Sequence, residues 1–100
     1  MDSALVTRSP GRRSMSEVVD CRRGSVRVSG DLTVQGADLL RGTVESLRRS
    51  GHDVVLVDLG DVRTTEAAGW DELEALRRSV SADGGELLLV APPVAPAPAR

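Results

Sequence analysis

The feature that most constrains the fold is the apolar run Val54-Val55-Leu56-Val57, which ends at Asp58-Leu59-Gly60. A short run that is rich in β-branched residues and bounded by turn residues is typical of a strand buried on both faces. We therefore expect a strand over Asp53–Leu59, followed by a short loop and a helix. In open sheets with parallel strands, the functional surface lies at such a strand-to-helix junction. This junction is the first place to look for a site.

Apolar periodicity places the remaining elements around this strand. Val26 and Val28 alternate with polar residues, which predicts a strand with one wet face in a hairpin at the sheet edge. We attribute Gly42, inside the first helix, to close packing on the sheet, because glycine there costs about 1 kcal/mol relative to alanine. We expect strands at Val18–Cys21, Ser25–Ser29 and Glu86–Val90, a turn at Gly30–Thr33, and helices at Gln35–Ser50 and Glu66–Ser81. This order predicts an α/β domain with a mixed sheet of about four strands and two main helices.

The two ends of the chain differ in composition from its middle. Residues 1–15 mix Ser, Arg, Pro and Gly with little apolar periodicity, and residues 92–100 are rich in Pro and Ala. We expect both segments to be tails without regular structure, because proline excludes a helix or a central strand and polar segments bury little apolar area. The predicted folded domain is therefore residues 16–91.

Composition excludes several classes of function. The net charge is −2 and Trp70 is the only aromatic residue, so neither a basic surface nor a set of base-stacking rings indicates nucleic-acid binding. The longest apolar runs have about five residues, far fewer than the ~20 that span a bilayer. A single cysteine, Cys21, forms no internal disulfide, which fits a reducing, cytoplasmic location. His52 is the only histidine, so we expect no metal site, no cofactor and no catalytic residues.

The junction and the turn before the first helix resemble the STAS domain, which is found in anti-sigma-factor antagonists and sulphate-transporter tails. Members typically have a Gly-(Glu/Asp)-Leu-Asp turn, then an apolar strand ending in Asp-Leu, then Asp-Ser-Ser-Gly opening a helix. The corresponding residues here are Gly30-Asp31-Leu32-Thr33, Asp58-Leu59 and Glu66-Ala67-Ala68-Gly69. The similarity covers about residues 17–93. It implies a STAS-like fold shortened at its C-terminus, where the family's third helix and last strand are replaced by the Pro/Ala tail.

The resemblance also implies a partner. In the family, an anti-sigma factor that is also a serine kinase phosphorylates the first serine of the motif and thereby releases the antagonist. Ala67 stands at that position and has no hydroxyl group, so the resemblance implies binding without the usual switch. Thr64 and Thr65 carry nearby hydroxyls that are possible phosphorylation sites, although we expect Thr65 to cap the helix. The partner-binding residues that we expect are Asp31, Thr33, Thr64, Thr65, Glu66, Ala67, Ala68, Gly69 and Trp70.

Two alternatives and two questions stay open at this point. Small STAS proteins also serve as subunits of ABC lipid-transport systems, where they dock on the ATPase. A more remote alternative is a receiver domain with Asp58 as the phosphoacceptor, but the chain lacks the lysine and the acidic pair that receivers use. Trp70 fills the core or anchors an interface, and the sequence predicts no oligomeric state.

Overall fold

The structure, a computed structural model, describes residues 4–8 and 15–91. Their elements follow in the order β1 (Ala4–Arg8), β2 (Met15–Asp20), β3 (Ser25–Leu32), α1 (Val34–Arg49), β4 (Val54–Thr65), α2 (Ala67–Ala82) and β5 (Glu86–Val90). The tails predicted at residues 1–3, 9–14 and 92–100 lie outside the described residues.

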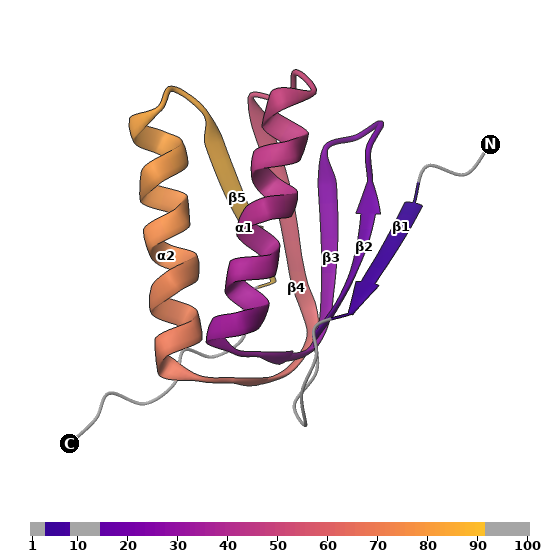
Figure 1. Cartoon of the computed structure of the whole chain (residues 1–100), viewed down its shortest axis with the longest axis vertical. Helices are drawn as coiled ribbons and strands as arrows, with labels where there is room; N and C mark the ends of the chain where they lie inside the picture. The colour runs from indigo at the N-terminus through magenta and orange to yellow at the C-terminus, as the bar shows by residue number, and fades with distance from the viewer. Residues whose placement is uncertain (1–3, 9–14, 92–100) are drawn as a thin grey trace.

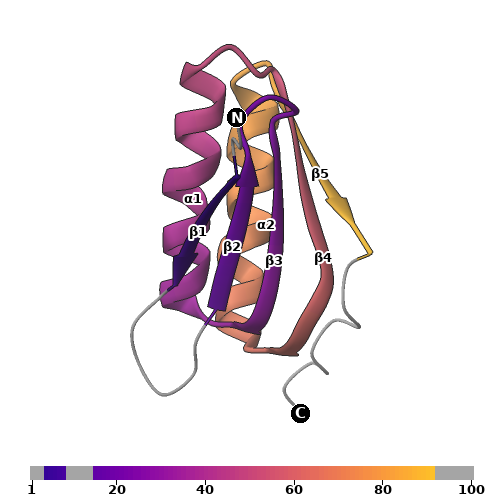
Figure 2. The same cartoon turned by 90° about the vertical axis from the view of Figure 1, so that its right-hand side faces the viewer.

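The strands form one mixed sheet in the order β1-β2-β3-β4-β5. The pairs β1–β2 and β2–β3 are antiparallel, whereas β3–β4 and β4–β5 are parallel. Each parallel connection contains one helix, α1 or α2, and both helices cover the same face of the sheet (Figures 1 and 2). The predicted α/β fold with a mixed sheet and two main helices is confirmed.

The core lies between this face of the sheet and the two helices. In β4, Val55, Val57 and Leu59 alternate toward the helices, as expected for a period of two residues. In α1 and α2, apolar residues recur every three or four positions and meet the sheet. The buried apolar residues are Met15, Val19, Val26, Val28, Leu32, Ala37, Leu40, Val44, Leu47, Val55, Val57, Leu59, Leu73, Leu76, Val80 and Leu87.

The amino-terminal prediction is wrong for residues 4–8, which form β1 rather than part of an irregular tail. It is also wrong for Met15, which is buried in the core, because β2 spans Met15–Asp20 and not Val18–Cys21. β1 pairs with β2 along its whole length, from Ala4 opposite Asp20 to Arg8 opposite Ser16. The β2–β3 hairpin is consequently not at the sheet edge as expected, because β1 occupies that edge. A five-residue edge strand carries too little periodicity to be recognised before its partner is known.

The two central strands are also longer than predicted. β4 continues from Val54 to Thr65, so Thr64 and Thr65 belong to the strand and not to a loop. Likewise β3 extends through Leu32, across most of the expected turn. Each strand supports the other, because Asp31 pairs with Thr64 and Leu32 pairs with Thr65 after two register shifts. Non-local pairing therefore overrides the local turn signals at Gly30 and Gly60.

The prediction that β4 is buried on both faces is wrong. The side opposite the helices is uncovered within the described part of the chain, and we call it the open face. Val54 is 47% exposed on this side, and Leu88 and Val90 of the neighbouring β5 are 38% and 39% exposed.

Candidate functional site

The predicted site lies at one end of the sheet, where β3 and β4 end and α1 and α2 begin (Figure 1). Because β3 and β4 are parallel, their carboxyl ends reach the same edge, and each chain then turns into its helix. Asp31 lies opposite Thr64 in the register of the two strands. The fold thus brings together two segments that are more than thirty positions apart in the sequence.

Asp31 links these two strand ends. The Thr64 hydroxyl donates a hydrogen bond to Asp31 Oδ1 at 2.5 Å. Arg63 Nη2 lies 3.5 Å from Asp31 Oδ2. The Asp31 side chain is only 13% exposed, whereas that of Arg63 is 73% exposed. Asp31 therefore acts as a recessed anchor, and Thr64 and Arg63 form the accessible surface above it.

The first turn of α1 is held by two side chains that the sequence assigned to partner binding. Thr33 is the N-cap, and its Oγ1 accepts a hydrogen bond from Gly36 N at 3.0 Å. Glu66 Oε1 accepts another from Val34 N at 3.3 Å. Such bonds satisfy amides that have no partner inside a helix. Thr33 is only 5% exposed, so it supports the site and offers little surface to a partner.

The expected capping of α2 by Thr65 is wrong. Thr65 lies in β4, and the N-cap position is Glu66, whose side chain makes no capping bond to α2. Glu66 N donates to Leu32 O at 2.9 Å, while its carboxylate reaches across to α1. Glu66 thus joins the starts of the two helices, which a local reading of the sequence had not shown.

Gly69 sets how closely the two helix starts approach each other. A Cβ atom at this position would lie 2.8 Å from Thr33 C and 3.0 Å from Leu32 O. Both neighbours are backbone atoms, which cannot rotate away, so only glycine fits without a shift. Gly69 is buried, whereas Ala67 and Ala68 before it are exposed.

Trp70 is half-buried and packs against the core. This placement favours the core role over the anchor role that the sequence had left open. The exposed part of the site is therefore smaller than predicted. We call it the junction surface, and it consists of Val34, Arg63, Thr64, Ala67 and Ala68.

Val34 and Arg63 were not among the predicted site residues. Val34 is 42% exposed, although it is an apolar residue at the start of a helix. The sequence could have indicated this exposure, because Val34 directly follows the capping residue Thr33. The first residue of a helix often points away from the core. Arg63 had no local signal, since its role depends on the pairing of β4 with β3.

The junction surface is suited to binding. Two alanines and a valine supply small apolar contacts, and Thr64 and Arg63 supply polar ones at the margin. The Thr64–Asp31 hydrogen bond below this surface joins the two strand ends.

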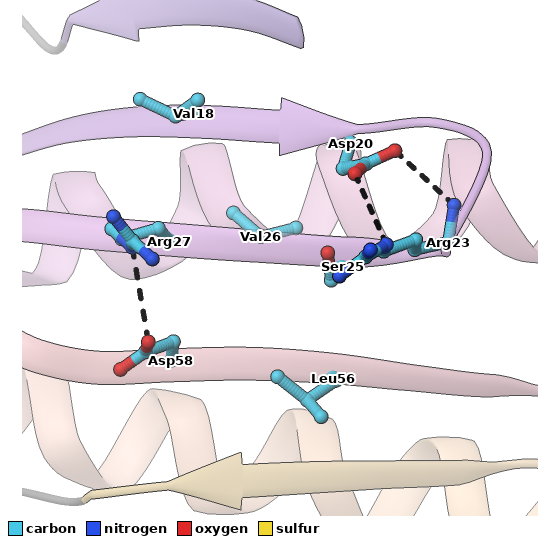
Figure 3. Close-up of a pocket in the computed structure, with 8 residues that line it drawn as sticks. All are labelled: Val18, Asp20, Arg23, Ser25, Val26, Arg27, Leu56 and Asp58. Carbon is cyan, nitrogen blue, oxygen red and sulfur yellow. Dashed lines mark hydrogen bonds and ion pairs between the residues drawn. The ribbon is translucent and has the colours of Figure 1, made fainter. Parts of the chain in front are cut away.

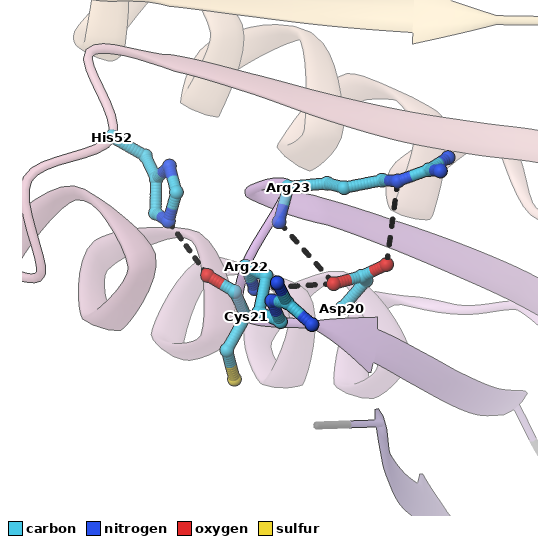
Figure 4. Close-up of polar contacts among 5 residues, drawn as sticks. All are labelled: Asp20, Cys21, Arg22, Arg23 and His52. Atoms are coloured by element: carbon cyan, nitrogen blue, oxygen red, sulfur yellow. Dashed lines mark hydrogen bonds and ion pairs between the residues drawn. The ribbon is translucent and has the colours of Figure 1, made fainter. Parts of the chain in front are cut away.

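Cys21 and His52 meet at the opposite end of the sheet, near the β2–β3 turn (Figure 4). His52 Nε2 lies 2.7 Å from the carbonyl oxygen of Cys21, so the contact involves the backbone and not the thiol. In the same turn, Asp20 Oδ1 accepts hydrogen bonds from the amides of Arg22 and Arg23. Among the described residues, no group of three or more His, Cys, Asp and Glu side chains is arranged to hold a metal ion.

Asp58 does not have the position that a receiver phosphoacceptor requires. It lies within β4, seven residues before the strand ends at Thr65, and not at the carboxyl end. Its Oδ1 accepts a hydrogen bond from Gly60 N at 2.9 Å, and its Oδ2 lies 3.8 Å from Arg27 Nε. Asp58 is thus part of the open face, away from the junction surface.

Comparison with known families matches residues 16–98 to the STAS domain. The chain belongs to the STAS family. A search among curated proteins finds no match. The STAS match includes both helix starts and both strand ends of the junction surface, while β1 precedes it. No helix in the described part of this STAS domain has the length and hydropathy needed to cross a membrane.

Proposed function

We propose that this STAS domain is a non-enzymatic, cytoplasmic binding module whose partner is an anti-sigma-factor-type serine kinase. The junction surface makes the contact, and binding is not released by phosphorylation at the usual serine position. The observation that carries this proposal is the exposed Ala67 at the first residue of α2, where the resemblance aligns the phosphorylated serine. The domain then acts as a constitutive antagonist, or as a competitor of relatives that do carry the serine.

The physical basis is the charge of the helix start. The amino end of α2 carries partial positive charge, and a phosphate there adds about two negative charges to a contact surface. Methyl groups at Ala67 and Ala68 avoid this change and permit close approach of a partner. Arg63 and Thr64 at the margin give that partner hydrogen-bonding groups.

The first experiment compares capture of partners by the wild-type chain with capture by Ala67→Glu. A permanent carboxylate on the junction surface is expected to reduce recovery of the kinase at least about tenfold, which corresponds to 1.4 kcal/mol. Ala82→Glu is the matched control, because Ala82 is an exposed alanine at the other end of the same helix. Glu at residue 67 is favourable for the helix, so a loss of binding would not reflect unfolding.

A second variant tests the missing switch directly. Ala67→Ser restores a hydroxyl group at the first residue of α2, and we expect the captured kinase and ATP to phosphorylate that serine. Phosphopeptide mass spectrometry locates the modified residue, and the wild-type chain should carry no phosphate at position 67. Equal capture of wild type and Ala67→Glu would contradict the proposal, as would recovery of an ABC-transporter ATPase in place of a kinase.

A further inference from the structure

The β5 edge of the sheet has no neighbouring strand on its outer side within the described residues. β5 is the last strand in the order, and its partner is β4. Glu86 N donates a hydrogen bond to Asp53 O at 2.8 Å, which fixes the alternation of this parallel ladder. The even-numbered residues of β5 therefore bond to β4, whereas the backbone groups of Leu87 and Leu89 point away from the sheet. An edge of this kind is a template for one more strand.

Side chains along this edge are also incompletely covered. Leu88, on the open face, is 38% exposed. A hollow of about 380 Å³ lies where β5 meets α2, and its lining includes Leu87, Leu89, Arg77 and Ser81. An added strand would place alternate side chains beside Leu88 and beside this hollow.

One charge at this edge has no partner. The Glu86 side chain is exposed, and it has no ion-pair partner within the described residues. At the centre of the open face, by contrast, Asp58 Oδ2 lies 3.8 Å from Arg27 Nε (Figure 3). A strand that brings a basic residue close to Glu86 would therefore suit the β5 edge.

The sequence that follows β5 meets these requirements. Residues 95–100 read Ala-Pro-Ala-Pro-Ala-Arg, with alanine at every odd position and proline at positions 96 and 98. Proline has no N–H group, so it is tolerated in an edge strand only where that group would face solvent. The odd positions of this segment keep the N–H groups that pairing with β5 requires.

We propose that residues 95–99 fold back along β5 as an antiparallel edge strand, which we call the strap. The chain leaves the extended conformation immediately after β5, because Ala91 has a φ of 50°. Residues 90–94 form the connection, whose length of about five residues is usual for a hairpin loop. The prolines that exclude a central strand are compatible with this position, because the strap lies at the outer edge of the sheet.

The register follows from which residues carry an N–H group. Ala95 lies opposite Leu89 and Ala97 opposite Leu87, and each pair exchanges two N–H···O bonds. A connection two residues shorter would set Pro93 opposite Leu89, where the missing N–H group would leave one bond unmade.

The same register accounts for the other features of the edge. Pro96 lies opposite Leu88 on the open face and shields this exposed side chain. The small alanine side chains of the strap point to the hollow beside α2. Arg100 lies diagonally across from Glu86, at a separation that a long side chain can span. The strap closes an edge that would otherwise accept a strand from another chain.

Amide hydrogen exchange of the full chain, followed by NMR, tests the proposal. The N–H groups of Leu87 and Leu89 should exchange at least about tenfold more slowly than in a chain that ends at Ala91. The N–H group of Leu88 bonds to β4, so it is the internal control and should keep its rate. Equal rates for Leu87 and Leu89 in the two chains overturn the proposal. Protection that rises with protein concentration also overturns it, because a second copy would then cover the edge.

Single substitutions in the full chain test the register. Ala97→Pro removes an N–H group that bonds to Leu87 and places a proline ring against the Leu87 carbonyl, so the Leu87 amide should lose its protection. Pro98→Ala is the matched control, because position 98 faces solvent, and it should leave the exchange of Leu87 almost unchanged. A nuclear Overhauser effect between the Hα atoms of Leu88 and Pro96 is expected, since they form a closely spaced pair. Full protection of Leu87 in Ala97→Pro, or the absence of this Hα contact, overturns the proposal.

Discussion

At the scale of single residues, Glu17 is the most unusual side chain. It is fully buried on the helix-facing side of β2, where Thr43 Oγ1 donates a hydrogen bond of 2.7 Å to its Oε1. Its Oε2 has no hydrogen-bond partner in the described part of the chain. Burial raises the pKa of Glu17 above its ordinary value of 4.5, and the bond from Thr43 only partly opposes this shift. Folding therefore makes the carboxyl group of Glu17 harder to ionise than it is in the unfolded chain.

This shift makes stability depend on pH. Between 4.5 and the raised pKa, the folded chain keeps a proton that the unfolded chain has released, so the free energy of unfolding falls as pH rises. The fall is steepest inside that window and ends above the raised pKa, where both states are ionised. We expect Glu17→Gln to be more stable than wild type at pH 7 and to lose this advantage below about pH 4. Urea unfolding at several pH values measures the difference.

The control for this prediction is Glu45→Gln, which changes an exposed glutamate on α1. It should leave the pH dependence of unfolding almost unchanged. If Glu17→Gln and wild type respond to pH in the same way, the carboxyl group of Glu17 is not kept protonated by the fold.

At the scale of elements, the two helices contain glycines with opposite roles. Gly69→Ala should destabilise the chain by about 1–3 kcal/mol, because the new methyl group meets the backbone of Leu32 and Thr33. Gly42→Ala should stabilise it by about 0.5–1 kcal/mol, since alanine is the better helix former and nothing lies within 4 Å of the new group. The inference that Gly42 packs closely on the sheet is therefore wrong.

Both variants replace a glycine by an alanine. Thermal unfolding measures the change in stability that each one causes. Opposite signs are expected. A stabilising Gly69→Ala would mean that α2 can move away from β3 without cost, and the compact junction described above would then be incorrect.

At the scale of the whole molecule, β1 completes the antiparallel side of the sheet. Removing residues 1–8 turns β2 into an edge strand, because β1 is its partner from Ala4 to Arg8. The alternate β2 amides that point toward β1 should exchange with solvent at least about tenfold faster. The β2 amides bonded to β3 provide an internal control and should keep most of their protection. Equal rates in the full and shortened chains would mean that β1 does not protect β2.

Much of the fold follows from local pattern. The helices begin within one residue of their predicted positions, and β5 has its predicted bounds, Glu86–Val90. Of the expected site, Asp31 and Thr64 do meet at the strand ends, and Ala67 and Ala68 lie exposed at the start of α2. Thr33 and Gly69 belong there as supports, which the sequence could not reveal, because burial depends on which backbone approaches them.

The sequence by itself determined the order of the elements from β2 to β5 and the strand–helix–strand unit that makes β4 and β5 parallel. Periodicity is a local property, and a strand–helix–strand unit requires parallel strands. Only the tertiary structure decided how far β3 and β4 extend, which helix Glu66 caps and which face of β4 is bare. Each of these depends on contacts between residues far apart in the chain. Those contacts allow β3 and β4 to continue past Gly30 and Gly60, where local signals alone predicted that the strands end.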